Sequence, residues 1–171
     1  MASLMENLID VLEKECSEYE VLLALSQKKA PIIVSGNLEE LQKITDEEQE
    51  IVSRVGNLEK RRITVTADIA NVLNKDVNTL KLAHLVEMLG GRPTEQKSLA
   101  ECHDRLQRAV GELQRINEHN RDLLNNALEI VEFELNMYQA MKTAPETANY
   151  NRSAYNAGDI MGVNRGFDTR Q

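Results

Sequence analysis

Apolar residues recur every three or four positions over most of this chain, the spacing that places side chains on one face of an α-helix. The first such run covers residues 3–30. Its apolar face consists of Met5, Leu8, Leu12, Cys16, Tyr19 and Leu22. Pro31 is expected to end or kink this helix, because proline removes a backbone donor and clashes with the preceding turn. Residues 32–34 then either add one more turn or line the bend.

A second helix is expected to begin at Asn37, a good N-cap residue that is followed three positions later by Glu40. Its apolar residues alternate in steps of three and four, a spacing typical of coiled coils. They are Leu41, Ile44, Ile51, Val55, Leu58, Val65, Ile69 and Val72. Glu48 and Arg62 are the two polar exceptions in this seam. Residues 74–78 have the composition of a turn, which ends the helix.

A short helix is expected over residues 80–89, begun by Thr79 and stopped by the glycines at 90–91.

The strongest helical pattern of the chain covers residues 99–141, and residues 143–145 are expected to end this last helix. One row of this last helix consists of Leu99, Cys102, Leu106, Ala109, Leu113, Ile116, Asn120, Leu123, Ala127, Ile130, Glu134, Met137 and Met141. A parallel row consists of Val110, Asn117, Leu124, Val131 and Tyr138. The combined stripe is too wide for one neighbour, so this helix should touch both of the others.

These elements predict an all-α fold: an elongated, antiparallel three-helix bundle with coiled-coil-like packing and one short extra helix at one end. We expect residues 1–143 to form the bundle and residues 144–171 to form a flexible C-terminal tail. Glycines at 158, 162 and 166 oppose a helix there, because each costs about 1 kcal/mol relative to alanine. Four apolar residues lie among them as candidate anchors for a partner: Ile160, Met161, Val163 and Phe167. An inert terminus is the alternative.

The charge of the chain narrows the classes of partner. Its 171 residues carry a net charge of −8, which repels the phosphates of nucleic acid and anionic lipid surfaces. No apolar run is long enough to span a membrane, and the first residues, M-A-S-L-M-E, lack the basic and apolar regions of a signal peptide. The sequence therefore predicts a cytoplasmic protein. In that compartment Cys16 and Cys102 are expected to be small core residues rather than a disulfide.

The residues that would carry catalysis or a metal are absent or badly spaced. His84, His103 and His119 have no partner pattern for nucleophilic catalysis, and the chain has no phosphate-binding glycine motif. Cys102 and His103 are adjacent and would point about 100° apart on a helix, with no second pair to complete a metal site. A histidine phosphotransfer bundle is an alternative, but none of the histidines is followed by the lysine and glycine of the H-x-x-K-G pattern of such domains. We predict a protein that is not an enzyme and uses no cofactor and no metal.

Two asparagines lie on or beside the seam of the last helix. A buried asparagine carries a desolvation cost, so Asn117 and Asn120 need a reason to be there. They either fix the register of the helices, as an asparagine does inside a coiled coil, or line a groove for a partner.

Four stretches resemble one known family. They are L-I-D-V-L-E-K-E-C-S-E-Y-E-V-L-L-A-L-S, I-V-S-G-N-L-E-E-L-Q-K-I-T-D-E-E-Q, L-E-K-R-R and I-N-E-H-N-R-D-L-L-N-N-A-L-E-I-V. The last contains an N-x-x-N-x-x-L-L pattern on Asn117, Asn120, Leu123 and Leu124. Over about residues 5–140 the chain is similar to the FlgN-type flagellar export chaperones.

This resemblance implies a cytosolic, non-enzymatic chaperone. Members bind the hook–filament junction (hook-associated) proteins before secretion, protect their C-terminal helical segments, and present them at the export gate of the flagellar type III apparatus. The C-terminal part of such chaperones binds the cargo. The tail of this chain departs from helix-rich versions of that part, because it is rich in Asn, Gly and Arg.

The sequence leaves two functions from different classes open. In the first, a monomeric or dimeric secretion chaperone binds an amphipathic cargo helix along Leu124, Val131, Tyr138 and Met141. In the second, the chain is a structural coiled-coil subunit that self-assembles permanently. A closed structural bundle would have no reason to leave the row at Leu124, Val131 and Tyr138 free for a further partner.

Overall fold

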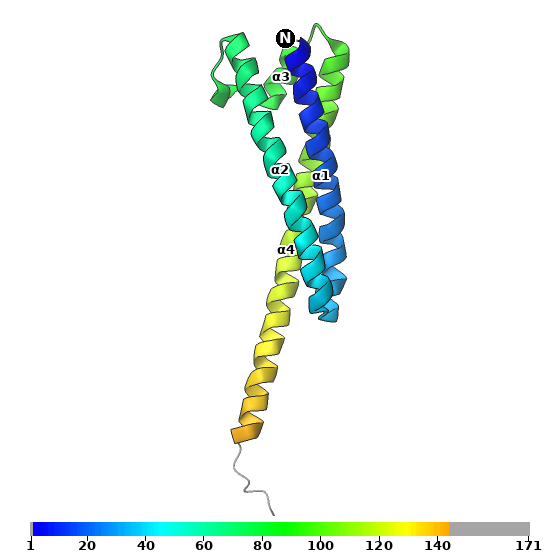
Figure 1. The fold of residues 1–171 in the computed structure, drawn as a ribbon, viewed down its shortest axis with the longest axis vertical. Helices are drawn as coiled ribbons and strands as arrows, with labels where there is room; N and C mark the ends of the chain where they lie inside the picture. Colours follow the sequence, from blue (N-terminus) through cyan, green and yellow to red (C-terminus); the bar gives the residue numbers. More distant parts are fainter. Residues whose placement is uncertain (1, 144–171) are drawn as a thin grey trace, which may run out of the picture. The chain divides into compact units, whose positions relative to one another are not determined.

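The computed structural model describes residues 2–143, and all regular secondary structure in that range is helical. The elements in chain order are α1 (Ala2–Ser35), α2 (Leu38–Leu73), a 3-10 turn η1 (Val77–Thr79), α3 (Leu82–Met88) and α4 (Pro93–Thr143). Contacts within the chain divide it into two units, Met1–Ile130 and Val131–Gln171. The first unit contains three long helical segments and the short α3 (Figure 1). The all-α prediction and the number of helices are confirmed.

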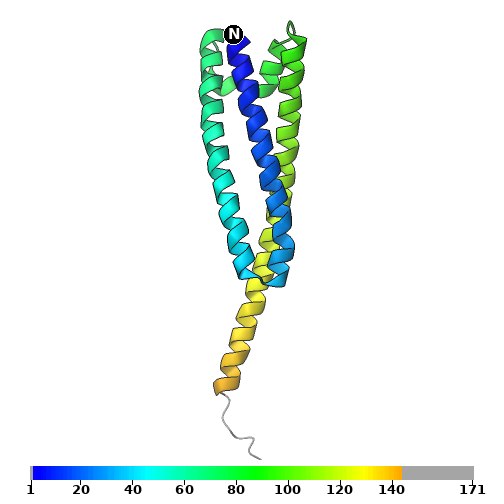
Figure 2. The ribbon, with the colours of Figure 1, turned by 45° about the vertical axis from the view of Figure 1, so that its right-hand side comes forward.

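The long helices of the first unit form a bundle in which consecutive helices run in opposite directions (Figures 1 and 2). Side-chain pairs show that α1 and α2 are antiparallel, because Glu15 meets Arg62 whereas Ser26 meets Glu48. The first and last helices run the same way, because Cys16 and Ser26 of α1 lie beside Cys102 and Asn120 of α4. This is the up-down-up topology that short connections produce.

The reversal between α1 and α2 takes two residues. Gly36 adopts φ +67°, a left-handed conformation that glycine reaches without a steric penalty. Asn37 then caps α2 as predicted, since its Oδ1 accepts a hydrogen bond from the Glu40 backbone N–H at 3.1 Å. Pro31 does not end α1, which continues to Ser35. The added turn contains Ile33, which is buried, so packing compensates for the backbone hydrogen bond that proline removes.

The segment between α2 and α4 differs in one detail from the prediction. Asn74 ends α2 in the left-handed conformation at φ 51°. Thr79 is not the N-cap of the short helix, which begins at Leu82 after Lys81 without a side-chain cap. The reason is that the Thr79 hydroxyl donates instead to the carbonyl of Asp76, at 2.8 Å, within the 3-10 turn. The predicted stop at the 90–91 glycines is confirmed.

The core consists of two clusters of buried side chains along the bundle. One cluster joins all four helices and contains Met5, Leu8, Leu12, Val65, Ile69, Ala70, Leu80, Leu85, Leu89, Leu99 and Cys102. The other joins the three long helices and contains Leu22, Leu25, Ile44, Ile51, Val55 and Leu113. The last helix therefore contributes side chains to both clusters, together with α1 and α2. The contribution of α3 is Leu85, which is fully buried.

The second unit contains the end of α4 and the predicted tail. Residues 131–143 are helical, and Thr143 is the last described residue of α4. The predicted flexible tail at 144–171, including Ile160, Met161, Val163 and Phe167, lies outside the described residues.

Candidate partner-binding site

The two polar residues that interrupt the apolar seam of α2 both pair with polar residues of α1. Arg62 donates from Nε to Oε1 of Glu15 at 3.1 Å and lies 3.0 Å from Oε2. Glu15 is only 1% exposed, so this is an ion pair inside the bundle. Burial raises the pKa of the Glu15 carboxyl and the Arg62 charge opposes that shift.

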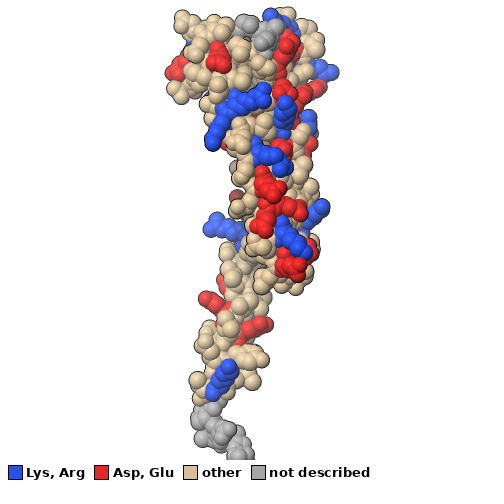
Figure 3. Space-filling view, in the orientation of Figure 1, with Lys and Arg blue, Asp and Glu red and all other residues tan. Residues whose placement is uncertain are grey.

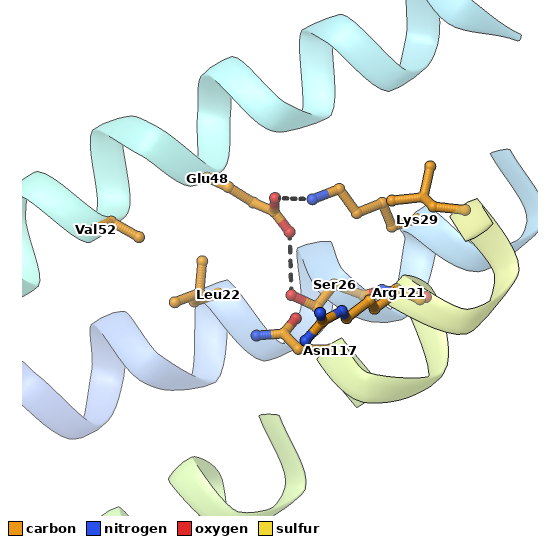
Figure 4. Close-up of a pocket in the computed structure, with 9 residues that line it drawn as sticks. Leu22, Ser26, Lys29, Glu48, Val52, Asn117 and Arg121 are labelled. Atoms are coloured by element: carbon orange, nitrogen blue, oxygen red, sulfur yellow. Dashed lines mark hydrogen bonds and ion pairs between the residues drawn. The ribbon is translucent and has the colours of Figure 1, made fainter. Parts of the chain in front are cut away.

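The second interruption of the seam, Glu48, joins a polar cluster between α1 and α2. The Ser26 hydroxyl donates to Oε1 of Glu48 at 3.0 Å, and the Lys29 ammonium group pairs with Oε2. Figure 4 shows Glu48 reaching from α2 toward these two residues of α1. Both oxygens of the Glu48 carboxylate are therefore engaged.

Asn120 lies inside the bundle and makes one hydrogen bond to α1. Its side chain is 4% exposed, and Nδ2 donates to the backbone carbonyl of Ser26 at 2.8 Å. Its Oδ1 is buried and has no hydrogen-bond partner among the described residues. A buried acceptor of this kind is costly to leave unpaired.

A pocket of about 340 Å³ lies beside Asn120, within the first unit. We call it the Asn120 pocket. Leu22, Ser26 and Lys29 of α1, Glu48 and Val52 of α2, and Asn117, Asn120, Arg121 and Leu124 of α4 line it. The pocket is thus mixed in character, with charged and amide groups beside three apolar side chains (Figure 4).

Farther along α4, large apolar side chains are exposed to solvent. We call this set the apolar arc: Leu128, Ile130, Val131, Phe133, Leu135, Met137, Tyr138 and Met141. Phe133 is 68% exposed and Met141 is 71% exposed. Uncharged side chains cover much of this part of α4 on the face seen in Figure 3, with a few charged residues among them. Exposed apolar patches of this kind commonly mark binding surfaces.

Helical geometry shows how wide the apolar arc is. At about 100° per residue, its eight members are spread over roughly two-thirds of the helix circumference. The remaining third is a polar strip that consists of Asn125, Glu129, Glu132, Asn136 and Gln139. Within residues 131–143 the arc is interrupted by Glu134 and Lys142.

The structure divides the predicted partner-binding residues into three groups. Asn117, Asn120 and Leu124 come together in the Asn120 pocket, although Asn117 is exposed and Asn120 is buried. Val131, Tyr138 and Met141 are exposed on α4, at 50%, 66% and 71%. The third group, at 160–167, lies outside the described residues.

Sequence reasoning missed several residues of these two surfaces. Four residues of the pocket were not predicted as site residues: Ser26, Lys29, Glu48 and Arg121. Glu48 was recognised only as a polar residue in an apolar seam. Phe133 and Leu135 were missed because they lie off both predicted rows of α4.

The two cysteines lie in the packed interior of the bundle. Cys16 and Cys102 are buried and free, and the Cys16 thiol donates to the backbone carbonyl of Cys102 at 3.4 Å. Burial raises the pKa of the Cys102 thiol to about 11. Across residues 2–143, no group of three or more His, Cys, Asp or Glu side chains is placed to hold a metal ion. No helix in that range has the length and apolar character that crossing a membrane requires.

Comparison with models of known protein families shows which family the chain belongs to. The model of the FlgN protein family matches residues 1–157. The chain belongs to the FlgN family. This family consists of flagellar export chaperones rather than enzymes, and its members bind flagellar proteins.

The chain is also similar to a curated protein over most of its length. The chain is 27% identical over 146 residues to the uncharacterized protein YvyG of Bacillus subtilis (strain 168), covering 85% of this chain and 84% of the relative. No solved structure matches the chain. The matched region of the FlgN model includes both the Asn120 pocket and the apolar arc.

Proposed function

We propose that the chain is a cytoplasmic type III export chaperone, monomeric or dimeric, that binds hook–filament junction proteins and delivers them to the flagellar export gate. Membership of the FlgN family supports the general role in flagellar export. The apolar arc of α4 supports the binding of a helical partner, and it is the observation on which this proposal rests.

The width of the apolar arc defines what the cargo must offer. One amphipathic helix covers only a stripe of a neighbouring helix, whereas this arc spans roughly two-thirds of the circumference. A single cargo helix docked on Leu124, Val131, Tyr138 and Met141 would leave Phe133 on another side of α4 in water. We therefore infer that the cargo contributes at least two helical segments, which pack around α4 and leave its polar strip outside.

The composition of the polar strip fits this orientation. Glu129 and Glu132 are charged and exposed, and burying them without partners would be costly. The four apolar residues at 160, 161, 163 and 167 are proposed as further anchors for the cargo or the gate. By binding the cargo, the chaperone would cover apolar helices of the cargo that would otherwise associate with one another. Preventing that association is the physical task of a secretion chaperone.

Co-purification with hook–filament junction proteins tests the cargo. The full chain should retain a junction protein, and a junction protein that lacks its C-terminal helical segment should be lost. A full-length chain that retains no junction protein of its own bacterium would contradict the proposed cargo. Retention of the cargo without any binding to the cytoplasmic domain of the export gate would contradict delivery alone.

A matched pair of variants tests the surface. Val131→Asp places a charge in the apolar arc, and Asn136→Asp places the same charge in the polar strip. Cargo affinity should fall by more than about tenfold, or ~1.4 kcal/mol, for Val131→Asp and should change little for Asn136→Asp. Equal effects of the two variants, or loss of helical content in Val131→Asp, would show that the arc is not the binding surface.

Light scattering distinguishes this proposal from permanent self-assembly. An isolated chaperone should remain a monomer or dimer and should change mass only when cargo is added. A large, stable homo-oligomer that Val131→Asp disrupts would identify the apolar arc as a self-assembly surface instead.

A further inference from the structure

Glu134 lies near the middle of the apolar arc. At about 100° per residue, Val131 and Tyr138 flank it on one side of α4, and Met137 flanks it on the other. All three flanking side chains are exposed, and so is Glu134. By contrast, Glu132 of the polar strip lies about 160° away around the helix. The arc therefore surrounds one carboxylate with apolar side chains.

The described part of α4 offers Glu134 no cation within one helical turn. Elsewhere on this helix a glutamate pairs with a nearby arginine, as Glu112 does with Arg115. Between Arg121 and Lys142, however, the sequence has no lysine or arginine. Lys142 follows Glu134 at a distance of about 12 Å along the helix axis, because each residue adds about 1.5 Å. Among the residues that the structure describes, α4 therefore gives Glu134 no ion pair of the kind that Glu112 makes.

Covering the arc would take the Glu134 carboxylate out of water. Burying a carboxylate without a counter-charge is costly, and a well-placed cationic partner offsets much of that cost. The glutamates of the polar strip avoid the problem, because they stay in water when the arc is covered. Glu134 does not avoid it, since a partner that reaches the apolar side chains on both sides must also cover the carboxylate between them. The partner therefore has to bring a positive charge to this point.

We propose that the apolar arc selects a helical cargo segment that carries one cationic side chain, best an arginine, in the middle of its apolar face, opposite Glu134. The guanidinium group donates two parallel hydrogen bonds to the carboxylate, a geometry that a lysine ammonium group does not provide. Its aliphatic stem packs against Val131 and Met137, as such stems do on apolar surfaces. This inference rests on the proposed function in one respect, that the partner is the cargo.

Other partners fit this position less well. A helix with an uninterrupted apolar face leaves the carboxylate without a counter-charge, and a helix with an acidic residue there repels it. A second copy of this chain centred on Glu134 would bring two carboxylates together. Charge complementarity thus favours a cargo helix over a second copy.

Three synthetic helical peptides test the pairing without the cargo. They share one sequence, with leucine on one face and alanine and glutamine elsewhere. They differ only at the central position of the leucine face, which is arginine, leucine or glutamate. Each peptide carries a fluorophore and is titrated with the full chain, and binding is followed by fluorescence anisotropy. The arginine peptide should bind the wild-type chain more tightly than the leucine peptide and at least about tenfold more tightly than the glutamate peptide.

A matched pair of charge reversals separates the local pair from the charge of the whole chain. Glu134→Arg should reverse the order of affinities, so that the glutamate peptide binds more tightly than the arginine peptide. Glu132→Arg makes the same change in net charge on the polar strip and should preserve the wild-type order. The preference of the wild-type chain for the arginine peptide should persist at an ionic strength of about 1 M, where exposed charges are screened beyond about 3 Å.

Three outcomes contradict the pairing. They are no binding of the arginine peptide to the wild-type chain, equal binding of the arginine and glutamate peptides, and the same change of order in Glu132→Arg as in Glu134→Arg. The chaperone role is tested separately, by retention of a junction protein and its loss in Val131→Asp. A chain that passes that test but binds all three peptides equally would keep the chaperone role and lose the Glu134 pairing.

Discussion

Arg62 on α2 holds its Nε 3.1 Å and 3.0 Å from the two carboxylate oxygens of Glu15 on α1, a residue that is 1% exposed. The carboxylate is thus buried beside a single cationic partner. Removing one member of a buried ion pair is more damaging than removing both, because the remaining charge has neither water nor a counter-ion.

Arg62→Met should therefore lower the free energy of unfolding by about 3–5 kcal/mol. The double variant Glu15→Leu/Arg62→Met should recover most of that loss or exceed wild-type stability. Urea unfolding followed by circular dichroism measures both. Arg54→Met is the control, because the Arg54–Glu18 pair is more exposed and should contribute only about 0–1 kcal/mol. Equal losses for Arg62→Met and Arg54→Met would contradict a special role for burial.

Stability should depend on pH through Glu15. Burial raises the pKa of this carboxyl above its usual value of 4.5. A group with a higher pKa in the folded state binds its proton more readily there, so its ionisation lowers the free energy of unfolding as pH rises. That cost is absent below 4.5 and complete above the raised pKa. The stability of Glu15→Gln relative to wild type should therefore increase with pH across this window. A difference that stays constant with pH would show that the Glu15 pKa is the same in both states.

The two cysteines should resist modification while the protein is folded. Cys16 and Cys102 are buried, and burial raises the pKa of both thiols, to about 11 for Cys102. At pH 8 about one Cys102 thiol in a thousand would be the reactive thiolate. Labelling with iodoacetamide should be slow in buffer and should accelerate at urea concentrations that unfold the chain. Fast labelling of the native protein would contradict the packing of α1 against α4.

Asn120→Leu should raise the thermal midpoint of unfolding, because it removes a buried oxygen that has no partner among the described residues. If Asn120 also fixes the register of α4 against α1, the variant should change the oligomeric state or helix alignment, as measured by light scattering and cross-linking. A more stable protein with unchanged oligomeric state but weaker cargo binding would assign Asn120 to recognition. Lower stability would show that the hydrogen bond to Ser26 outweighs the unpaired oxygen.

Truncation after Thr147 tests the residues beyond the described range. It removes Ile160, Met161, Val163 and Phe167, the proposed anchors. Affinity for the cargo or for the cytoplasmic domain of the export gate should fall, as measured by isothermal titration calorimetry. Gly162→Val in the full chain should also weaken binding if the glycine allows close approach of a partner backbone. A truncated chain that binds both partners as tightly as the full chain would reduce this segment to a spacer.

Much of the bundle could be predicted because local signals determine it. The cap at Asn37 and the stop at the 90–91 glycines depend on residues close in sequence. The error at Thr79 arose because its hydroxyl donates to the carbonyl of Asp76 instead of capping the short helix. Of the two outcomes left open after Pro31, the structure shows the added turn, because α1 continues to Ser35 past a buried Ile33.

The candidate site was less predictable, because spacing does not reveal what covers a face. The seam positions Leu113 and Ile116 are buried, whereas Ile130, Met137 and Met141 continue the same spacing and are exposed. Glu48 was recognised as an exception in the seam, but its partners Ser26 and Lys29 come from another helix, and no local pattern joins them.

The apolar arc has a consequence for the protein before it meets any cargo. A helix with exposed apolar side chains around most of its circumference attracts other copies of itself, and short-range attraction of this kind leads to aggregation. The net charge of −8 opposes that encounter, because like-charged molecules repel over about 10 Å at an ionic strength of 0.1 M. The colloidal stability of the cargo-free protein is therefore set by a balance between one helix and the charge of the whole chain. Added salt screens the repulsion between molecules and shifts that balance toward clustering. A bound cargo covers the apolar arc and so removes the attraction between molecules altogether.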